Sequence, residues 1–70
     1  MSATPDATHR NPVREVRQAL GLTQLEMAVK LGCSHFMVWR CEDRRMLPRE
    51  TAILIELRTL AKRAGIEIEL

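Results

Sequence analysis

Apolar residues recur along this chain at the three- and four-residue spacing of helices, in stretches separated by glycine or proline. These stretches cover residues 12–20, 23–31, 34–42 and 49–64. The side chains predicted to face a common core are, in chain order, Val13, Val16, Leu20, Met27, Ala28, Leu31, Val38, Cys41, Leu54, Leu57, Leu60, Ala61 and Ala64. The pattern therefore predicts an all-α fold of four helices, of which the fourth is the longest.

Capping residues indicate where these helices begin. Asn11 before Pro12 is typical of a helix start. Asparagine can cap the first turn, and the N–H that proline lacks would have no helical partner at the first position of a helix. Thr23 followed by Glu26 predicts a capping box, and Ser34 predicts the cap of the third helix. The first, second and fourth helices are expected to end at Gly21, Gly32 and Gly65. The short glycine turn between the second and third helices predicts a helix-turn-helix.

The two ends of the chain fall outside the helical pattern. Residues 1–10 are mostly small and polar without a period, which predicts a flexible arm before a domain of residues 11–65. Residues 66–70 alternate isoleucine or leucine with glutamate, the period of a strand that is too short to be stable alone. We therefore expect a short extended, strand-like tail whose pairing partner would come from another chain or another edge.

Composition narrows the class of protein. A chain of 70 residues with 46% hydrophobic and 29% charged side chains fits one small folded domain. No unbroken apolar run is longer than residues 52–55, and residues 1–8 do not resemble a secretory signal, so we expect a cytoplasmic protein without a membrane span. Cys33 and Cys41 lack metal-binding spacing; we expect two buried thiols, no disulfide, no metal and no cofactor.

Basic residues are concentrated in the middle of the chain. The net charge of the whole sequence is only +2, but residues 12–49 hold an excess of arginine and lysine, and the C-terminal segment is slightly acidic. A positive field over a helix-turn-helix favours a nucleic-acid partner. No histidine or carboxylate is placed near a nucleophile and no glycine-rich phosphate loop is present, so we do not expect an enzyme.

The segment around the two central helices carries the clearest motif. Residues 16–24 read Val-Arg-Gln-Ala-Leu-Gly-Leu-Thr-Gln, and they are followed by Ala28, Gly32, Ser34, Val38 and Glu42. This run resembles the lambda-repressor and Cro-like (Xre-type) helix-turn-helix family over about residues 13–60. The resemblance implies a compact four-helix, lambda-repressor-like domain. It also implies a sequence-specific transcription regulator, a repressor or an antitoxin, that reads double-stranded DNA with the third helix.

The resemblance also implies which side chains contact DNA. They are Gln24, Ser34, His35, Phe36, Trp39, Arg40, Arg44, Arg45 and Arg49. Arg40 is the best candidate for base reading, because arginine can bond the O6 and N7 edge of guanine. Gln24 would bond a phosphate or brace the recognition helix, Ser34 would cap that helix and contact a phosphate, and His35 would donate to a base or a phosphate. The arginines that follow would neutralise phosphates; for each residue the alternative is an ordinary solvated side chain.

Two further implications concern structure. Arg17 and Glu42 fall where family members often pair the first helix with the end of the third, which would be a structural contact. We also expect this protein to act as a homodimer on a two-fold site, with half-sites about one helical turn, or about 10 base pairs, apart. The outer face of the fourth helix and the tail of residues 66–70 are the candidate dimer contacts.

The sequence also departs from the family pattern. Cys41 takes the core position where a bulky residue is usual, Trp39 lies outside, and Arg44 replaces a glycine, which predicts a strained backbone there. The second helix carries apolar residues on its outer face, where the family norm is polar. An alternative is therefore a protein-binding module that docks a toxin or the transcription machinery on an apolar face of Leu25, Val29, Phe36 and Trp39.

Overall fold

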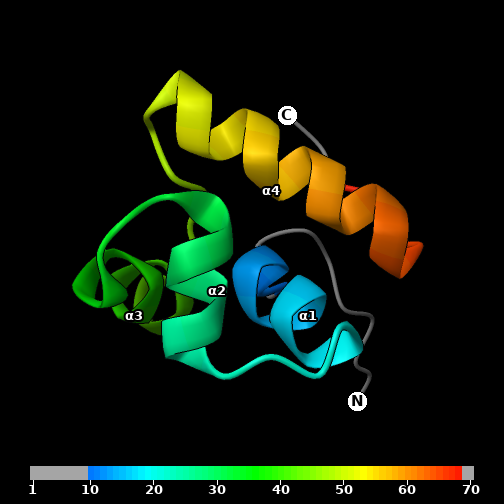
Figure 1. Ribbon diagram of the computed structural model, residues 1–70, viewed down its shortest axis with the longest axis horizontal. Coiled ribbons are helices and arrows are strands. Elements are labelled where there is room, and N and C mark those ends of the chain that lie inside the picture. Colours follow the sequence, from blue (N-terminus) through cyan, green and yellow to red (C-terminus); the bar gives the residue numbers. More distant parts are fainter. Residues whose placement is uncertain (1–9, 69–70) are drawn as a thin grey trace, which may run out of the picture.

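The computed structural model describes residues 10–68 and contains four helices in that part of the chain (Figure 1). They are α1 (Pro12–Ala19), α2 (Gln24–Leu31), α3 (His35–Arg44) and α4 (Thr51–Ala64). Helices α2 and α3 lie side by side, and α4 crosses over α1 and α2. The described residues form no strand. The predicted all-α fold with a helix-turn-helix is confirmed, although α4 begins at Thr51, two residues later than predicted.

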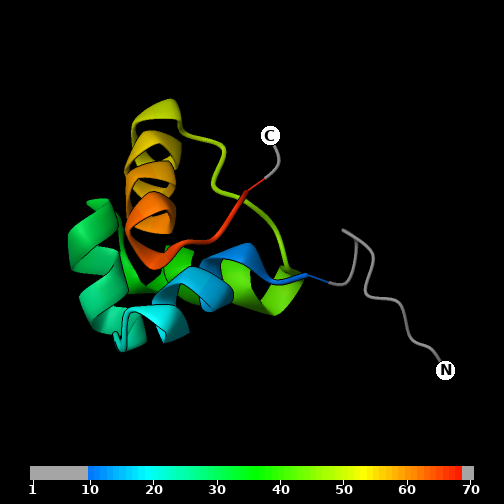
Figure 2. The same cartoon turned by 90° about the vertical axis from the view of Figure 1, so that its right-hand side faces the viewer.

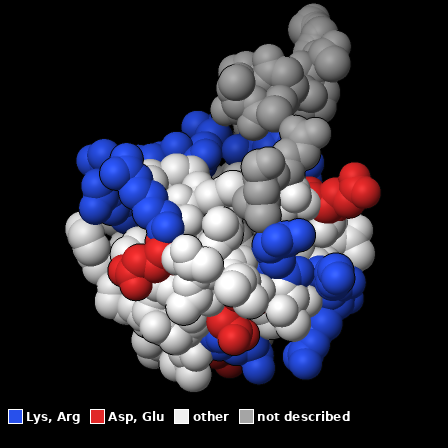
Figure 3. Space-filling view, turned by 90° about the horizontal axis from the view of Figure 1, so that it is seen from above, with Lys and Arg blue, Asp and Glu red and all other residues white. Residues whose placement is uncertain are grey.

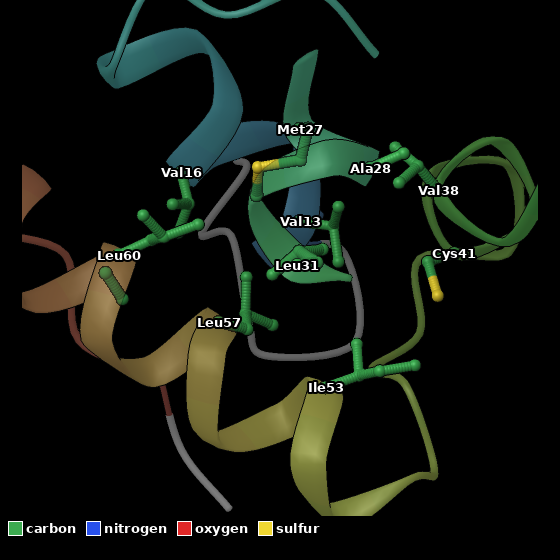
Figure 4. Packing of buried hydrophobic residues seen from close by; sticks show 11 residues of the cluster. Val13, Val16, Met27, Ala28, Leu31, Val38, Cys41, Ile53, Leu57 and Leu60 are labelled. Atoms are coloured by element: carbon green, nitrogen blue, oxygen red, sulfur yellow. The ribbon is translucent and has the colours of Figure 1, made fainter. Parts of the chain in front are cut away.

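One hydrophobic core joins the four helices, whose apolar side chains point toward one another (Figure 4). Its buried residues are Val13, Val16, Met27, Ala28, Leu31, Val38, Cys41, Ile53, Leu57, Leu60 and Ala61. The prediction missed Ile53, and it placed Leu20, Leu54 and Ala64 inside, whereas these three are half-buried. Ile53 precedes Leu57 by four residues, so these two share the inner face of α4 and Leu54 lies at its edge.

The caps of α2 and α3 are as predicted. The Thr23 hydroxyl accepts a hydrogen bond from the Glu26 amide at 3.1 Å, and the Glu26 carboxylate accepts one from the Thr23 amide at 2.8 Å. The Ser34 hydroxyl accepts a hydrogen bond from the Met37 amide at 3.1 Å. Between these caps Gly32 has φ of +75°, a left-handed conformation that is costly for other residues. These local contacts set the turn between α2 and α3.

The start of α1 differs from the prediction, because the Asn11 side chain makes no capping hydrogen bond. The side-chain amide nitrogen of Asn11 instead donates to the backbone carbonyl oxygen of Glu42 at 2.8 Å, which ties the start of α1 to the end of α3. The Glu15 carboxylate accepts from the Asn11 backbone amide at 3.2 Å and pairs with Arg10 at 2.6 Å. Arg10, predicted to belong to a flexible arm, is therefore tied to α1. The rest of that predicted arm, residues 1–9, lies outside the described residues.

The segment after α4 is not a strand in its described part, residues 66–68. The Ile66 amide donates to the Ala61 carbonyl at 2.9 Å, and the segment turns back from the end of α4 (Figure 2). Ile66 and Ile68 are half-buried against the domain's own core. The alternation that predicted a strand is thus explained by packing within the same chain, and residues 69–70 of the predicted tail lie outside the described part.

Candidate functional site

Helix α3 buries one side and exposes the other, at the edge of the domain (Figure 1). Val38, Cys41 and Glu42 form its buried side. The residues predicted to contact DNA from this helix and its cap, Ser34, His35, Phe36, Trp39 and Arg40, are all exposed. The structure therefore brings these five side chains to the outer side of one helix, as predicted.

The two aromatic residues of α3 stack on each other in the open. Phe36 is 64% exposed and Trp39 is 48% exposed, and their ring centroids lie 5.8 Å apart with 27° between the planes. Offset stacking at this distance is a favourable geometry for an aromatic pair, and it limits the rotamers of both side chains. The pair is therefore a pre-arranged apolar surface beside Arg40.

A second apolar surface lies on the outer face of α2. Leu25 is 58% exposed and Val29 is 75% exposed, as the departure from the family pattern predicted. Together with Leu22 they line a shallow hollow. Phe36 is not among the residues that line this hollow, so the apolar lining comes from α2 and from Leu22, two residues before it, rather than from the aromatic pair.

The predicted ion pair of Arg17 and Glu42 is present and is part of a larger network. Arg17 donates to both carboxylate oxygens of Glu42, at 2.6 and 3.0 Å, and the Glu42 side chain is only 1% exposed. Arg14 and Gln24 each donate to the same carboxylate at 3.2 Å, and no spacing in the sequence predicted these two contacts with Glu42. Burial raises the pKa of Glu42, but the hydrogen bonds from Arg17, Gln24 and Arg14 outweigh it, so the pKa is lowered and the carboxylate is charged.

The Gln24 carboxamide links this network to the outer face of α3. Its nitrogen faces Glu42, and its oxygen lies 3.3 Å from Nε2 of the His35 ring. Of the two roles predicted for Gln24, the structure shows the bracing contact to the recognition helix. No pattern in the sequence pairs Gln24 with His35, because the contact depends on how α2 and α3 cross.

The arginines at the end of α3 and after it are all exposed, namely Arg44, Arg45 and Arg49. Arg44, where strain was predicted, is the last helical residue, and the left-handed residue is Arg45, with φ of +53°. The helix thus ends two residues later than the predicted range of 34–42. Arg40 and Arg49 line one hollow together with Met37, Met46 and Pro48, so the loop before α4 returns Arg49 to the side of α3.

Both cysteines are free thiols, Cys41 buried and Cys33 only half-buried, which corrects the prediction that both are buried. Burial raises the pKa of each thiol, so both are poor nucleophiles. Within residues 10–68, no three side chains of histidine, cysteine, aspartate or glutamate gather where they could hold a metal ion.

The outer face of α4 has a different character (Figure 3). Lys and Arg lie at both sides of this face with some Asp and Glu beside them, and mostly uncharged side chains lie between. Ile55 is 54% exposed there, and it lines a hollow with Arg58, Thr59 and Lys62. This face holds none of the residues predicted to contact DNA.

These features define a class of protein: a four-helix domain whose helix-turn-helix exposes aromatic and basic side chains on the second helix of the motif. Comparison with protein-family models, with curated proteins and with solved structures gave no match. None of the helices described has the length and apolar character needed to cross a bilayer.

Proposed function

We propose that this protein is a sequence-specific DNA-binding regulator, a repressor or an antitoxin, that reads the major groove of double-stranded DNA with α3. The observation that carries the proposal is the division of α3 into two sides. One side is fixed to α1 and α2 through Glu42, and the other presents His35, Phe36, Trp39 and Arg40 to solvent. A rigidly held helix with exposed donors is what base reading needs.

The dimensions and charges of α3 support this role. Its 10 residues span about 15 Å, and an α-helix fits the major groove of B-DNA, which is about 12 Å wide. Arg40 would bond guanine, and the exposed arginines at the end of α3 and after it would lie along phosphates. Phe36 and Trp39 would pack on thymine methyl groups or sugars.

The proposal includes a homodimer on a two-fold site, with half-sites about 10 base pairs apart. The outer face of α4 is its proposed contact, centred on the exposed Ile55. A regulator of this kind would work in the cytoplasm and would not be an enzyme, as the sequence predicted.

A second candidate function is a protein-binding module. The observation that favours it is the apolar hollow on α2, where Leu25 and Val29 are more than half exposed. Large exposed apolar groups mark binding surfaces, and this one lies apart from the basic residues of α3. A toxin or a part of the transcription machinery would dock there, either instead of DNA or in addition to it.

The test is selection of bound duplexes from a randomised library, with the wild type, Arg40→Ala and a control, Arg63→Ala, at an exposed position of α4 outside the hollow of Ile55. We expect a two-fold motif for the wild type and the control. Arg40→Ala should lose preference at one base pair, by about 1–3 kcal/mol, or about 5- to 150-fold. Absence of any motif, with no binding at low salt, would refute the DNA proposal and favour the apolar hollow of α2 as the working surface.

A further inference from the structure

The hydrogen-bond chain from Glu42 to His35 determines where the imidazole of His35 carries its proton. The Glu42 carboxylate is charged and can only accept hydrogen bonds, so the Gln24 atom that faces it, at 3.2 Å, is the amide nitrogen. The other end of the carboxamide, the oxygen, then faces His35 Nε2 at 3.3 Å. A carbonyl oxygen can only accept, so Nε2 of His35 is the donor and carries a hydrogen.

The hydrogen-bonding role of the second ring nitrogen follows from that of the first. A neutral imidazole has one N–H, so a hydrogen on Nε2 leaves Nδ1 as an acceptor. His35 is exposed and is the first residue of α3, whereas Arg40, further along the same outer side, offers only donors. The outer side of α3 therefore presents an acceptor near its start and donors further along.

Resting on the proposed function, we infer that His35 is a specificity residue that accepts a hydrogen bond from an exocyclic amino group in the major groove, adenine N6 or cytosine N4. These amines are the hydrogen-bond donors that bases show in that groove, whereas guanine and thymine show acceptors there. The half-site would therefore have adenine or cytosine where His35 reaches and guanine where Arg40 reaches. This reverses the polarity expected from the sequence, in which His35 donates.

The contact is pre-arranged before DNA binds. Gln24 holds the His35 ring from α2, Glu42 holds Gln24, and Arg17 holds Glu42 from α1. The side chain that would read the base is thus oriented by a hydrogen-bond chain that runs through the buried Glu42 to α1. Loss of Gln24 should free the ring and allow either nitrogen to carry the hydrogen.

The experiment uses the duplex selected by the wild type and deletes one amine at a time. Each adenine is replaced by purine, which lacks N6, and each cytosine by 2-pyrimidinone, which lacks N4. Dissociation constants are measured by fluorescence anisotropy for the wild type, His35→Ala and Gln24→Leu. Because amine loss also weakens base pairing, the effect is read as the difference between wild type and His35→Ala on the same pair of duplexes.

We expect one position per half-site where amine deletion weakens wild-type binding by about 5- to 150-fold more than it weakens His35→Ala. Whether purine or 2-pyrimidinone gives the loss identifies adenine or cytosine. Gln24→Leu should show a smaller loss at that position, with unchanged circular dichroism. In the free wild-type protein, long-range ¹H–¹⁵N NMR spectra should show the His35 proton on Nε2.

Other outcomes overturn the inference. Amine deletions that affect the wild type and His35→Ala equally would show that His35 does not accept from a base. A proton on Nδ1 in the NMR spectra would contradict the hydrogen-bond chain itself. Either result leaves the proposed function standing, because a duplex has been selected; failure to select any duplex overturns the proposed function and this inference with it.

Discussion

At the scale of single residues, Glu42 is the acid on which three helices converge. Its carboxylate accepts from Arg14 and Arg17 of α1 and from Gln24 of α2, and its backbone carbonyl accepts from Asn11. A buried charge is tolerated only when it is paired and hydrogen-bonded, and here the pairing fixes the orientation of α3. Glu42 therefore contributes both to the stability of the domain and to the placement of the outer side of α3.

Glu42→Gln tests this role. The substitution removes the charge but keeps the size, so it leaves Arg17, which is 16% exposed, without its charged partner. We expect a loss of about 3–5 kcal/mol in the free energy of unfolding, measured by urea denaturation with circular dichroism. Glu56→Gln, at an exposed position of α4, is the control and should change little. A loss below about 1 kcal/mol, the value of a surface pair, would contradict the network.

Acid should weaken the domain through Glu42. Its pKa in the folded protein is lowered from the ordinary 4.5, so its contribution to stability is present above that value and is lost as pH falls through the folded pKa. Hydrogen bonding to Arg10 lowers the pKa of the half-buried Glu15 in the same direction. The urea midpoint should therefore fall as pH drops below about 4.5, and less steeply in Glu42→Gln. Equal pH profiles for the two proteins would refute this.

At the scale of elements, the turns and caps were the most predictable features. Thr23, Glu26 and Ser34 form contacts with residues three positions away, so the spacing in the sequence is enough to predict these capping hydrogen bonds. Asn11 was mispredicted because a contact with Glu42, 31 residues away, competes with the local cap. Contacts between helices depend on how the helices cross, which the spacing of apolar residues along each helix does not predict.

The end of α3 offers a test at this scale. Arg45 has φ of +53°, which costs a non-glycine residue about 1–2 kcal/mol, whereas glycine adds about 0.4–1 kcal/mol of unfolded-state entropy. Arg45→Gly should therefore stabilise the domain by roughly 0.5–1 kcal/mol, measured as a higher urea midpoint. Arg45→Ala, which keeps the strain, is the matched control. Destabilisation by glycine would show that the Arg45 side chain makes a contact worth more than the strain.

At the scale of the whole molecule, the predicted binding residues lie on and beside α3, and the face over α4 carries none of them. The sequence predicted the members of the outer side of α3 because a helical period and the family run place them there. It did not predict that Gln24 joins His35 to Glu42, or that Arg49 returns to the side of Arg40, because both depend on the packing of separate elements.

The proposed homodimer makes a prediction at this scale. Ile55 is exposed on α4 beside Arg58 and Lys62, so Ile55→Lys should disrupt a contact centred there by adding charge to a basic surface. We expect the wild type to sediment as a dimer and the variant as a monomer, with unchanged circular dichroism. Arg63→Ala, at another exposed α4 position, is the control. A wild type that stays monomeric at high concentration would contradict the dimer, and an unaffected variant would exclude this face.

The most direct test of the central claim, that the outer side of α3 contacts DNA, uses Trp39 as a reporter. It is the only tryptophan in the sequence and is 48% exposed on that side. Its fluorescence should change on titration with the selected duplex, and log K should fall linearly with log salt concentration, with a slope of about −0.9 per phosphate contacted. Binding that leaves Trp39 emission unchanged, or no binding even at low salt, would contradict the account.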